Sequence, residues 1–377
     1  MRIVVLADVP VGLLPGLEDL PKPVGHYATW LEALIPEFEA IPGLDLHWIV
    51  MAKGVRQART RRSLGQTLHV LPRYRKLVSM LTAYRFEIMR IRRLIRRLDP
   101  QIVHAWGSED VYGLAGACSG CQRRVFTLQG CQAETVAIDP RPALLARLQA
   151  SFEPGMIRRY PVATGESELS IRHLRRIHPG IEPHRIECGV PLPFFGAHWN
   201  PSDQPNVLFA GRVCSSKGVH DLIEAFRAPS LQGIVLNIAG QGDLVARIQA
   251  EGLPNVRILG RLSCPELIAQ MEQAWCLVIP TYADTGPSVV KEARVVGLPV
   301  ITTTAAGAAT YISEAGCGFV IEPGNRDQLA AAMARVCASR DACLALGRNG
   351  WAGHREVFHP GNAARQFAEL YRSLAGA

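Results

Sequence analysis

The stretch I-P-T-Y-A-D-T-G-P-S-V-V-K-E-A-R-V-V-G-L-P-V, residues 279–300, has the pattern of a strand end, a turn and a helix. The apolar run Trp275–Ile279 before it predicts the strand. We expect the helix to run from about Pro287 to Val296, because proline suits a first helical position. Gly297 then fits a C-terminal cap, and Pro299 prevents the helix from continuing.

The turn before this helix gathers groups that suit an anion. Gly286 can adopt backbone conformations closed to other residues, and Ser288 adds a hydroxyl beside unpaired backbone donors. A helix that follows a strand directly offers free N–H groups and the positive end of its dipole to a phosphate. Two carboxylates flank these donors, Asp284 before the helix and Glu292 eight positions later. The alternative interpretation is an ordinary turn with a solvated Asp and Glu.

The remainder of the chain alternates apolar strand-like runs with helical stretches. At 377 residues and 48% hydrophobic content it can bury two cores, so we expect two domains. The alternation is typical of α/β domains with parallel sheets. Gly189–Pro205 is dense in Pro and Gly and is the best linker candidate. The predicted strands are Ile3–Leu6, Leu46–Val50, Ile102–Ala105, Val125–Leu128 and Val162–Thr164, then Val207–Ala210, Ile234–Ala239, Val256–Leu259, Cys276–Ile279 and Val300–Thr302.

Ten cysteines stand at irregular spacings, and no secretion signal or long apolar run accompanies them. This pattern favours a reducing, cytoplasmic setting with free thiols over a disulfide framework. Cys118 and Cys121, with Cys131 nearby, could form half of a zinc site, but no second closely spaced pair completes it. We therefore interpret these cysteines as small buried residues on a helix.

The net charge of +8 lies wholly in the first half, where residues 1–192 hold 26 basic and 18 acidic side chains. Residues 53–97 alone carry +13, and the remainder of the chain carries −5. Within residues 81–98 one apolar face is predicted for a helix, with arginines opposite. That face consists of Leu81, Tyr84, Ile88, Ile91, Ile95 and Leu98, and the arginines are Arg90, Arg93, Arg96 and Arg97.

Such a basic amphipathic helix is at least a surface helix of the first domain. It also suits an anionic surface, either membrane lipid or nucleic acid, and we favour lipid. A non-catalytic binder of RNA or another acidic polymer through residues 53–97 is the less favoured alternative. The aromatic stacking platforms expected of such proteins are absent from the sequence.

Asp284-x7-Glu292, followed by Ala293 and G-L-P-V, resembles the E-x7-E signature of glycosyltransferase family four, the retaining group 1 glycosyltransferases with the GT-B fold. In that family the first acid contacts the donor sugar, the second contacts the ribose, and the amides between them contact the diphosphate. The resemblance implies donor contacts at Asp284 and Glu292, and at the turn residues Gly286, Pro287, Ser288 and Val289. Here the first acid is Asp, and T-G-P-S replaces the usual turn.

Two further segments of the second half resemble the same family. Gly211-Arg212 through Lys217-Gly218 is similar to its G-R-x-x-x-x-K-G segment, in which Arg and Lys hold the donor diphosphate. Ala239-Gly240-Gln-Gly242 is similar to its A-G-x-G turn, and Val245 at the third glycine position argues against a dinucleotide fold. Leu259-Gly260 stands where the family contacts the base. The resemblance thus implies catalytic roles for Arg212, Lys217 and Asp284, and nucleotide contacts at Gly211, Gly240, Gly242 and Leu259.

The first half resembles the family less closely. V-H-A-W at 103–106 and T-L-Q-G at 127–130 stand where the family has V-x-H-x-H and T-x-H-G. Gln129 replaces a histidine, so no acid–base role is possible at that position. The loop around Gly25 and His26 is similar to the family's glycine-rich loop. The residues implied on the acceptor side are Gly25, His26, His104, Gln129 and Gly130.

The resemblance implies a fold of two doubly wound Rossmann-like domains with the active site between them. Residues 1–192 would bind the acceptor and 193–357 the nucleotide sugar. A C-terminal helix at 358–377 would pack back toward the first domain. The implied activity is retaining transfer of a hexose from a nucleoside diphosphate sugar to a lipid-linked or polysaccharide acceptor. The alternative is another GT-B activity, a nucleotide-sugar epimerase or a phosphorylase.

The resemblance also implies that no metal and no cofactor take part. The sequence holds no Asp-x-Asp pair of the kind that bridges a metal to a diphosphate in the other large glycosyltransferase fold. Arg212, Lys217 and the Pro287 helix terminus would replace the cation. We expect a cytoplasmic enzyme of polysaccharide biosynthesis, peripheral at an anionic membrane surface through residues 81–98, with no nucleic acid partner.

Overall fold

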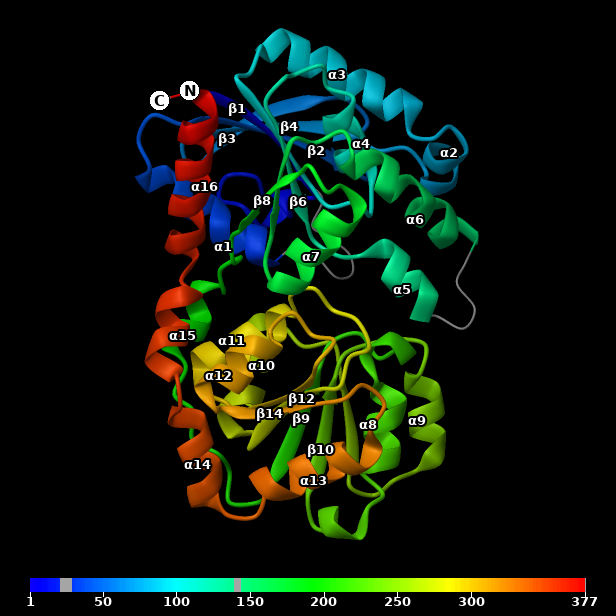
Figure 1. The fold of residues 1–377 in the computed structure, drawn as a ribbon, viewed down its shortest axis with the longest axis vertical. Coiled ribbons are helices and arrows are strands. Elements are labelled where there is room, and N and C mark those ends of the chain that lie inside the picture. The colour runs from blue at the N-terminus through cyan, green and yellow to red at the C-terminus, as the bar shows by residue number, and fades with distance from the viewer. Residues whose placement is uncertain (21–28, 139–143, 377) are drawn as a thin grey trace. The chain divides into compact units, whose positions relative to one another are not determined.

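The computed structural model describes residues 1–20, 29–138 and 144–376 (Figure 1). The chain divides into two compact units. Unit 1 comprises Met1–Val136, Arg141–Gly189 and Pro360–Ala377, and unit 2 comprises Ala137–Pro140 and Val190–His359. The chain therefore leaves unit 1 at Gly189, inside the Pro- and Gly-rich stretch, and its last helix returns to unit 1.

Unit 1 is built on an eight-stranded sheet with the strand order β3-β4-β2-β1-β5-β6-β7-β8. All neighbours pair in parallel except β3 and β4, which form an antiparallel hairpin. The strands are β1 (Arg2–Leu6), β2 (Asp45–Ala52), β3 (Arg59–Ser63), β4 (Gln66–Pro72), β5 (Ile102–Trp106), β6 (Arg124–Leu128), β7 (Val162–Gly165) and β8 (Glu182–Arg185). All five strands predicted for this sheet are confirmed, and β3, β4 and β8 are additional.

Helices cover both faces of this sheet, as a parallel sheet requires. They are α1 (Thr29–Glu37), α2 (Lys76–Leu81), α3 (Arg85–Leu98), α4 (Val111–Ala117), α5 (Gln132–Ile138), α6 (Leu144–Ile157), α7 (Glu168–Ile177) and α16 (Pro360–Ala375), with 3₁₀ turns at Val11–Leu13 and Phe38–Ala40. The alternation of β1 shows the two cores: Ile3 and Val5 pack with α16, whereas Val4 and Leu6 pack with α3.

A helix was predicted only for the last part of the basic segment, residues 53–97, and α3 confirms it from Arg85 onward. The first part of the segment is the β3–β4 hairpin, and the chain turns at Leu64 and Gly65, both with positive φ. Its second part is two helices, because Ala83 and Tyr84 also have positive φ and end any continuous helix there. Ile91 and Ile95 are buried as expected, but Leu81 ends α2 and is 77% exposed. Leu81 therefore does not belong to the buried apolar face.

Unit 2 has a six-stranded, all-parallel sheet with the order β11-β10-β9-β12-β13-β14. The strands are β9 (Asn206–Ala210), β10 (Val235–Ala239), β11 (Val256–Gly260), β12 (Cys276–Ile279), β13 (Val300–Thr303) and β14 (Gly318–Ile321). The five predicted strands are confirmed, and β14 was missed because its sequence, G-F-V-I, is short and begins with glycine.

Eight helices cover the described sheet of unit 2: α8 (Val219–Ala225), α9 (Val245–Glu251), α10 (Cys264–Gln273), α11 (Ser288–Val296), α12 (Ala309–Ala315), α13 (Arg326–Val336), α14 (Arg340–Arg348) and α15 (Trp351–Val357). Short 3₁₀ turns lie at Leu192–Gly196, Ser215–Lys217 and Pro229–Leu231. The fully buried Arg294 of α11 donates hydrogen bonds to the carbonyls of Leu298 (2.9 Å) and Asn349 (2.7 Å). These bonds anchor α11 to the end of α14 and so fix the helix that follows β12.

Three properties of the described residues bear on the setting of the protein. None of the helices within 1–20, 29–138 and 144–376 combines the length and apolarity needed to cross a membrane. No disulfide joins cysteines in the same ranges. Cys118 caps the C-terminus of α4 and Cys121 lies in the following turn, so the prediction that they are buried helix residues was wrong. The candidate half zinc site is absent there too, because Cys131 groups with other partners.

Candidate functional site

The strand order of unit 2 places a switch point between β9 and β12. From β9 the chain continues outward through β10 and β11, then crosses to β12 on the other side of β9. In open α/β sheets ligands bind beyond the carboxyl ends of the strands at such a point. Arg212 and Lys217 follow β9, and Asp284 follows β12. The fold therefore brings these three predicted residues to the two strand ends beside the switch point.

An ion pair joins the two loops at this point. The ammonium of Lys217 pairs with Oδ2 of Asp284, and Oδ1 of the same carboxylate accepts a hydrogen bond from the Gly286 amide at 3.2 Å. The backbone supports the pairing, since the Tyr282 amide donates to the Ser216 carbonyl at 2.9 Å. Asp284 thus links the loop after β9 to the turn before α11.

Backbone packing holds the loop after β10 against the loop after β9. A side chain at Gly240 would strike the carbonyl oxygen of Gly211, and one at Gly242 would strike the backbone of Val213. Both Gly211 and Gly240 have positive φ, at 150° and 155°. The Val213 amide donates to the Gln241 carbonyl at 3.0 Å. These two loops can approach each other only because glycine stands at these positions.

Arg212 differs from Lys217 in its surroundings. Its side chain is exposed, and no ion pair to it occurs within the part of the chain that the structure describes. A guanidinium in this position presents a planar set of donors that fits a phosphate in two-point fashion. The pair therefore offers one cation already held by a carboxylate and one cation open to a ligand.

The helix after β12 begins one residue later than predicted. Pro287 is the N-cap, with extended ψ of 105°, and not the first helical residue. It supplies no side-chain cap, so the first-turn amides of Ser288 and Val289 have no cap acceptor. Gly286 does not use a positive φ, whereas Gly297 caps the C-terminus at φ 103° as predicted. The uncapped helix start fits an anionic ligand.

Glu292 lies on α11 and is buried. Burial raises its pKa to about 7, and the adjacent Lys291 ammonium opposes that shift. A carboxyl group with this pKa is partly protonated near neutral pH. Its ionised form gains from any hydroxyl donor that a ligand brings to it.

At the edge of the unit 2 sheet, Leu259 and Gly260 end β11. The Gly260 carbonyl accepts a hydrogen bond from the Gly240 amide at 2.7 Å, so the ends of β10 and β11 are joined. Leu259 is half-buried against the unit 2 core. A base contact through this backbone stays a prediction.

The acceptor-side residues predicted in unit 1 differ in where the structure places them. Gly25 and His26 lie outside the described residues. His104 is completely buried, with Nδ1 2.7 Å from the Tyr371 hydroxyl and Nε2 2.6 Å from Thr127 Oγ1. Burial lowers its pKa to about 3. His104 therefore anchors α16 to the sheet and has no surface to offer an acceptor, which corrects the prediction.

Gln129 and Gly130 stand at the carboxyl end of β6 and are partly exposed. The sequence analysis did not single out Glu109, which lies beside Gln129. Both side chains approach Gly107 so closely that a Cβ atom there would clash with Glu109 Oε2 and Gln129 Oε1. Burial raises the pKa of Glu109 to about 7. One signal in the sequence could have identified Glu109. In W-G-S-E-D, residues 106–110, an acid follows shortly after the end of a buried strand, where ligands of α/β sheets bind.

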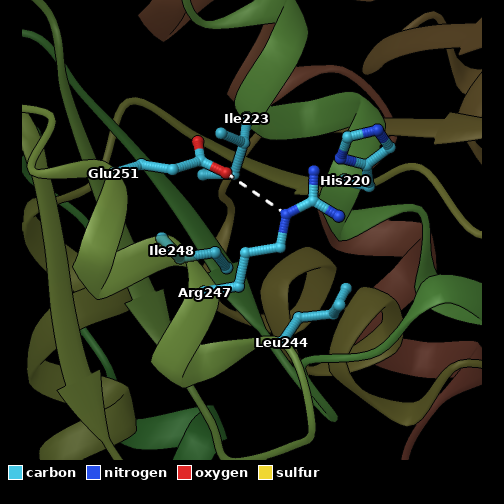
Figure 2. Close-up of a pocket in the computed structure, with 6 residues that line it drawn as sticks. All are labelled: His220, Ile223, Leu244, Arg247, Ile248 and Glu251. Carbon is cyan, nitrogen blue, oxygen red and sulfur yellow. Dashed lines mark ion pairs between the residues drawn. The ribbon is translucent and has the colours of Figure 1, made fainter.

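A separate hollow lies between α8 and α9 (Figure 2). His220, Ile223, Leu244, Arg247, Ile248 and Glu251 line it, and Arg247 Nε pairs with Glu251 Oε1 at 3.5 Å. Its volume of about 10 Å³ admits roughly one water molecule. It contains none of the predicted site residues and is too small for a nucleotide.

Part of this chain is similar in sequence to known glycosyltransferases. Residues 194–352 match the family model of group 1 glycosyl transferases. Among curated relatives, the D-rhamnosyltransferase WbpZ of Pseudomonas aeruginosa is 28% identical over 43% of this chain and 44% of its own. The lipopolysaccharide glucosyltransferase WaaG of Escherichia coli is 37% identical over 34% of this chain and 36% of its own. The chain thus aligns with less than half the length of these relatives.

Solved structures match over the full length. Sucrose-phosphate synthase from Thermosynechococcus elongatus has a TM-score of 0.82 at 18% identity, covering 99% of each chain. HepE of Anabaena, solved with UDP and glucose, has a TM-score of 0.72 at 15% identity over 99% of this chain and 100% of its own. At these identities the likeness concerns the fold alone. The protein has the GT-B fold, with two Rossmann-like α/β domains, as the sequence predicted.

Proposed function

We propose that this protein is a metal-independent, retaining glycosyltransferase of family four that transfers a hexose from a nucleoside diphosphate sugar. The observation that carries the proposal is the Lys217–Asp284 ion pair at the unit 2 switch point, with the exposed Arg212 on the same loop. The Asp284 carboxylate suits a hydroxyl of the donor sugar. The neighbouring lysine and the uncapped start of α11 suit the diphosphate. The family match over residues 194–352 covers all of these positions.

The diphosphate would bind to Arg212, Lys217 and the amides at the start of α11. Negative charge builds on the leaving nucleoside diphosphate as the glycosidic bond to it breaks. Two cations and fixed backbone donors stabilise that charge without reorganising. In a front-face displacement the departing phosphate oxygen would accept the acceptor's proton, so the protein need not supply a base on this side.

The two carboxyl groups would have separate roles. Asp284 is already oriented by Lys217 and by the Gly286 amide, which suits a fixed contact to the donor sugar. Glu292 is buried on α11 with a pKa of about 7, which suits acceptance of ribose hydroxyls in its ionised form. Asp284 in place of glutamate shortens the reach of the first acid by one methylene.

We further propose a lipid-linked or polysaccharide acceptor in cell-surface glycan synthesis, reached by peripheral association of unit 1 with an anionic membrane. The curated relative WaaG, a lipopolysaccharide glucosyltransferase, supports this acceptor class. The α2–α3 surface supports the association, because it combines exposed arginines with exposed apolar side chains. The apolar ones are Leu77, Val78, Leu81, Phe86 and Met89.

The α2–α3 surface is held in place by buried polar contacts. The Ser79 hydroxyl of α2 donates to the buried carboxylate of Glu87 in α3. The Tyr74 ring packs on Phe86 at 6.3 Å between centroids, and the Arg90 guanidinium lies 5.1 Å from the Tyr74 centroid. The exposed apolar groups are thus presented by an ordered scaffold.

Calorimetric titration of the pure protein with UDP, GDP and ADP tests the donor assignment. One diphosphate should bind at micromolar concentration in a 1:1 ratio, and failure of all three would refute the nucleotide site. Sugar release from the matching labelled donor then separates the activities. A glycosyltransferase needs an acceptor hydroxyl, whereas an epimerase would alter the donor without one and a phosphorylase would need inorganic phosphate.

A further inference from the structure

Three potential metal ligands converge in unit 1, whereas the predicted donor residues belong to unit 2. Cys131 follows β6, Glu134 lies on α5 and His173 lies on α7. One ligand atom from each side chain lies within 4.8 Å of the other two. Cys131 and His173 are buried, so the group is enclosed by the protein. Thiolate, imidazole and carboxylate together form a typical ligand set for zinc.

The two nitrogens of the His173 ring have different surroundings. Nδ1 is 3.2 Å from Glu134 Oε1. Nε2 is buried without a hydrogen-bond partner among the described residues, and Glu153 Oε2 lies 3.9 Å from it. An unpartnered polar atom in a protein interior is costly, so its orientation needs an explanation.

Glu153 provides that explanation. It is buried, and its Oε1 accepts hydrogen bonds from the Ser108 hydroxyl at 2.6 Å and the Gln132 amide at 3.3 Å. The Ala133 amide donates to Oε2 at 3.4 Å. A histidine that binds a metal through one nitrogen usually donates its other N–H to a carboxylate, which fixes the ring. Glu153 Oε2 is the carboxylate oxygen that faces Nε2, at 3.9 Å, which is longer than a hydrogen bond.

We propose that Cys131 Sγ, a Glu134 carboxylate oxygen and His173 Nδ1 bind a divalent transition metal, with zinc as the best fit, and that Glu153 orients the histidine. The thiolate and imidazole select zinc over magnesium or calcium, which prefer oxygen ligands only. Three protein ligands leave a fourth position for water or a further ligand. This site is independent of the proposed sugar transfer and of the donor residues.

The Arg176 guanidinium contacts the proposed metal ligands. Its Nη2 lies 2.9 Å from Glu134 Oε1 and 2.9 Å from His173 Nδ1, the two atoms that would bind the metal. The side chain is 66% exposed, so it can move into solvent when a metal enters. The guanidinium and the metal therefore compete for the same two atoms. Removing the guanidinium should strengthen metal binding.

The metal would link the β6–α5 connection to α7. The Cys131 thiol must lose its proton to bind the metal. Metal affinity should therefore rise with pH. Gln129 and Gly130 immediately precede Cys131, so the bound metal would also restrain the predicted acceptor-side turn.

Cobalt titration of the chelator-treated protein tests the site. Co²⁺ should bind in a 1:1 ratio with a thiolate-to-cobalt charge-transfer band, and zinc should displace it. Cys131→Ser should abolish the band, and His173→Gln should weaken zinc at least tenfold in chelator competition. Arg176→Ala should tighten zinc severalfold. Cys121→Ser is the matched control, because this half-buried cysteine lies outside the cluster and its loss should change nothing.

Thermal unfolding followed by circular dichroism shows whether each variant is folded, so a lost metal site can be distinguished from a failure to fold. Zinc should raise the Tm of the parent and of Cys121→Ser, but not of Glu134→Gln or His173→Gln, provided each variant melts cooperatively. A parent without the charge-transfer band would overturn the proposal. So would a band that survives in Cys131→Ser, because other thiols would then bind the metal.

Discussion

Lys217 and Asp284, 67 residues apart in sequence, form an ion pair that joins the loops after β9 and β12. The two side chains are 28% and 16% exposed, so the pair is partly shielded from solvent. Asp284 neutralises the lysine that we propose for the diphosphate. Under that proposal a bound diphosphate would share Lys217 with this carboxylate.

This competition yields a prediction that separates binding from catalysis. Asp284→Asn should leave diphosphate affinity unchanged or raise it severalfold, because Lys217 loses its competing carboxylate. The same change should lower kcat at least tenfold, ~1.4 kcal/mol, through the lost contact to the donor sugar. Calorimetry with the preferred diphosphate and initial rates at saturating donor measure the two effects. Parallel loss of affinity and rate would show that Asp284 acts only as structural support.

Arg212 and Lys217 should each contribute directly to diphosphate binding. Replacing either by alanine should weaken binding by ~1.5–3 kcal/mol, the range for a charge-assisted hydrogen bond, without unfolding the domain. Arg348→Ala is the matched control, since this exposed arginine ends α14, outside the loops of the donor site. If both site variants bind the diphosphate as tightly as Arg348→Ala does, Arg212 and Lys217 do not contact the diphosphate.

The pKa of Glu292 gives the donor site a pH signature. Ribose hydroxyls bind the ionised carboxylate best, and burial raises its pKa from 4.5 to about 7. Diphosphate affinity of the parent should therefore increase severalfold between pH 6 and pH 8. Glu292→Gln should lose that part of the pH dependence. The diphosphate's own titration is common to both proteins, so the difference between their calorimetric profiles isolates Glu292.

The raised pKa of Glu292 should also make the folded protein less stable as pH rises, whereas it should make diphosphate binding stronger. Because the folded pKa of Glu292 lies above its ordinary value of 4.5, ionisation costs folding energy as pH rises from about 4.5 through 7. Glu292→Gln removes this cost. The variant should gain ~1–3 kcal/mol relative to the parent between pH 5 and pH 8 in urea unfolding. A constant difference across that range would place the carboxyl in a better-solvated environment than the structure shows.

The position of the expected donor residues at strand ends was predictable because its signals are local, whereas their donor role stays a prediction. Gly211, Gly240 and Lys217 stand at strand ends that a parallel α/β alternation already places on one edge of a sheet. The acceptor half was not, since His104 occupies a strand position where buried and exposed histidines look alike in sequence. Its core role depends on Tyr371, 267 residues away. No local pattern could pair these two residues.

The errors in the basic segment have a similar origin. The arginine-rich β3 is an edge strand, and charges on such a strand prevent pairing with other chains but conceal its strand character. The break between α2 and α3 falls at Ala83 and Tyr84, neither of which is a usual residue for positive φ. The Cys131 cluster was missed because its third ligand, His173, lies on another helix, 39 residues from Glu134.

Sugar transfer should not require a metal at the donor site. Under the proposed mechanism the cations Arg212 and Lys217 would replace one, so added Mg²⁺ or Mn²⁺ should leave kcat unchanged and turnover should persist in excess chelator. His173→Gln is the control, because it lacks the proposed zinc site of unit 1 and isolates donor-site metal from structural metal. A strict Mg²⁺ requirement in this variant would contradict the mechanism.

Membrane association should depend on both components of the α2–α3 surface. Each arginine near an anionic membrane contributes ~1 kcal/mol, less at higher salt, and each buried apolar group contributes independently of salt. Changing Arg90, Arg93, Arg96 and Arg97 to glutamine should lower cosedimentation with anionic liposomes and weaken its salt dependence. Changing Leu77, Leu81 and Met89 to serine should lower it while the salt dependence remains.

Leu192→Ser is the matched control for the apolar changes, because this half-exposed leucine belongs to a 3₁₀ turn of unit 2. It should pellet with vesicles as the parent does, and all variants should keep parental diphosphate affinity because the donor contacts lie in unit 2. If both α2–α3 variants still pellet like the parent, the surface is only a solvated face. The acceptor would then be a soluble glycan, since a lipid-linked one requires the enzyme at the bilayer.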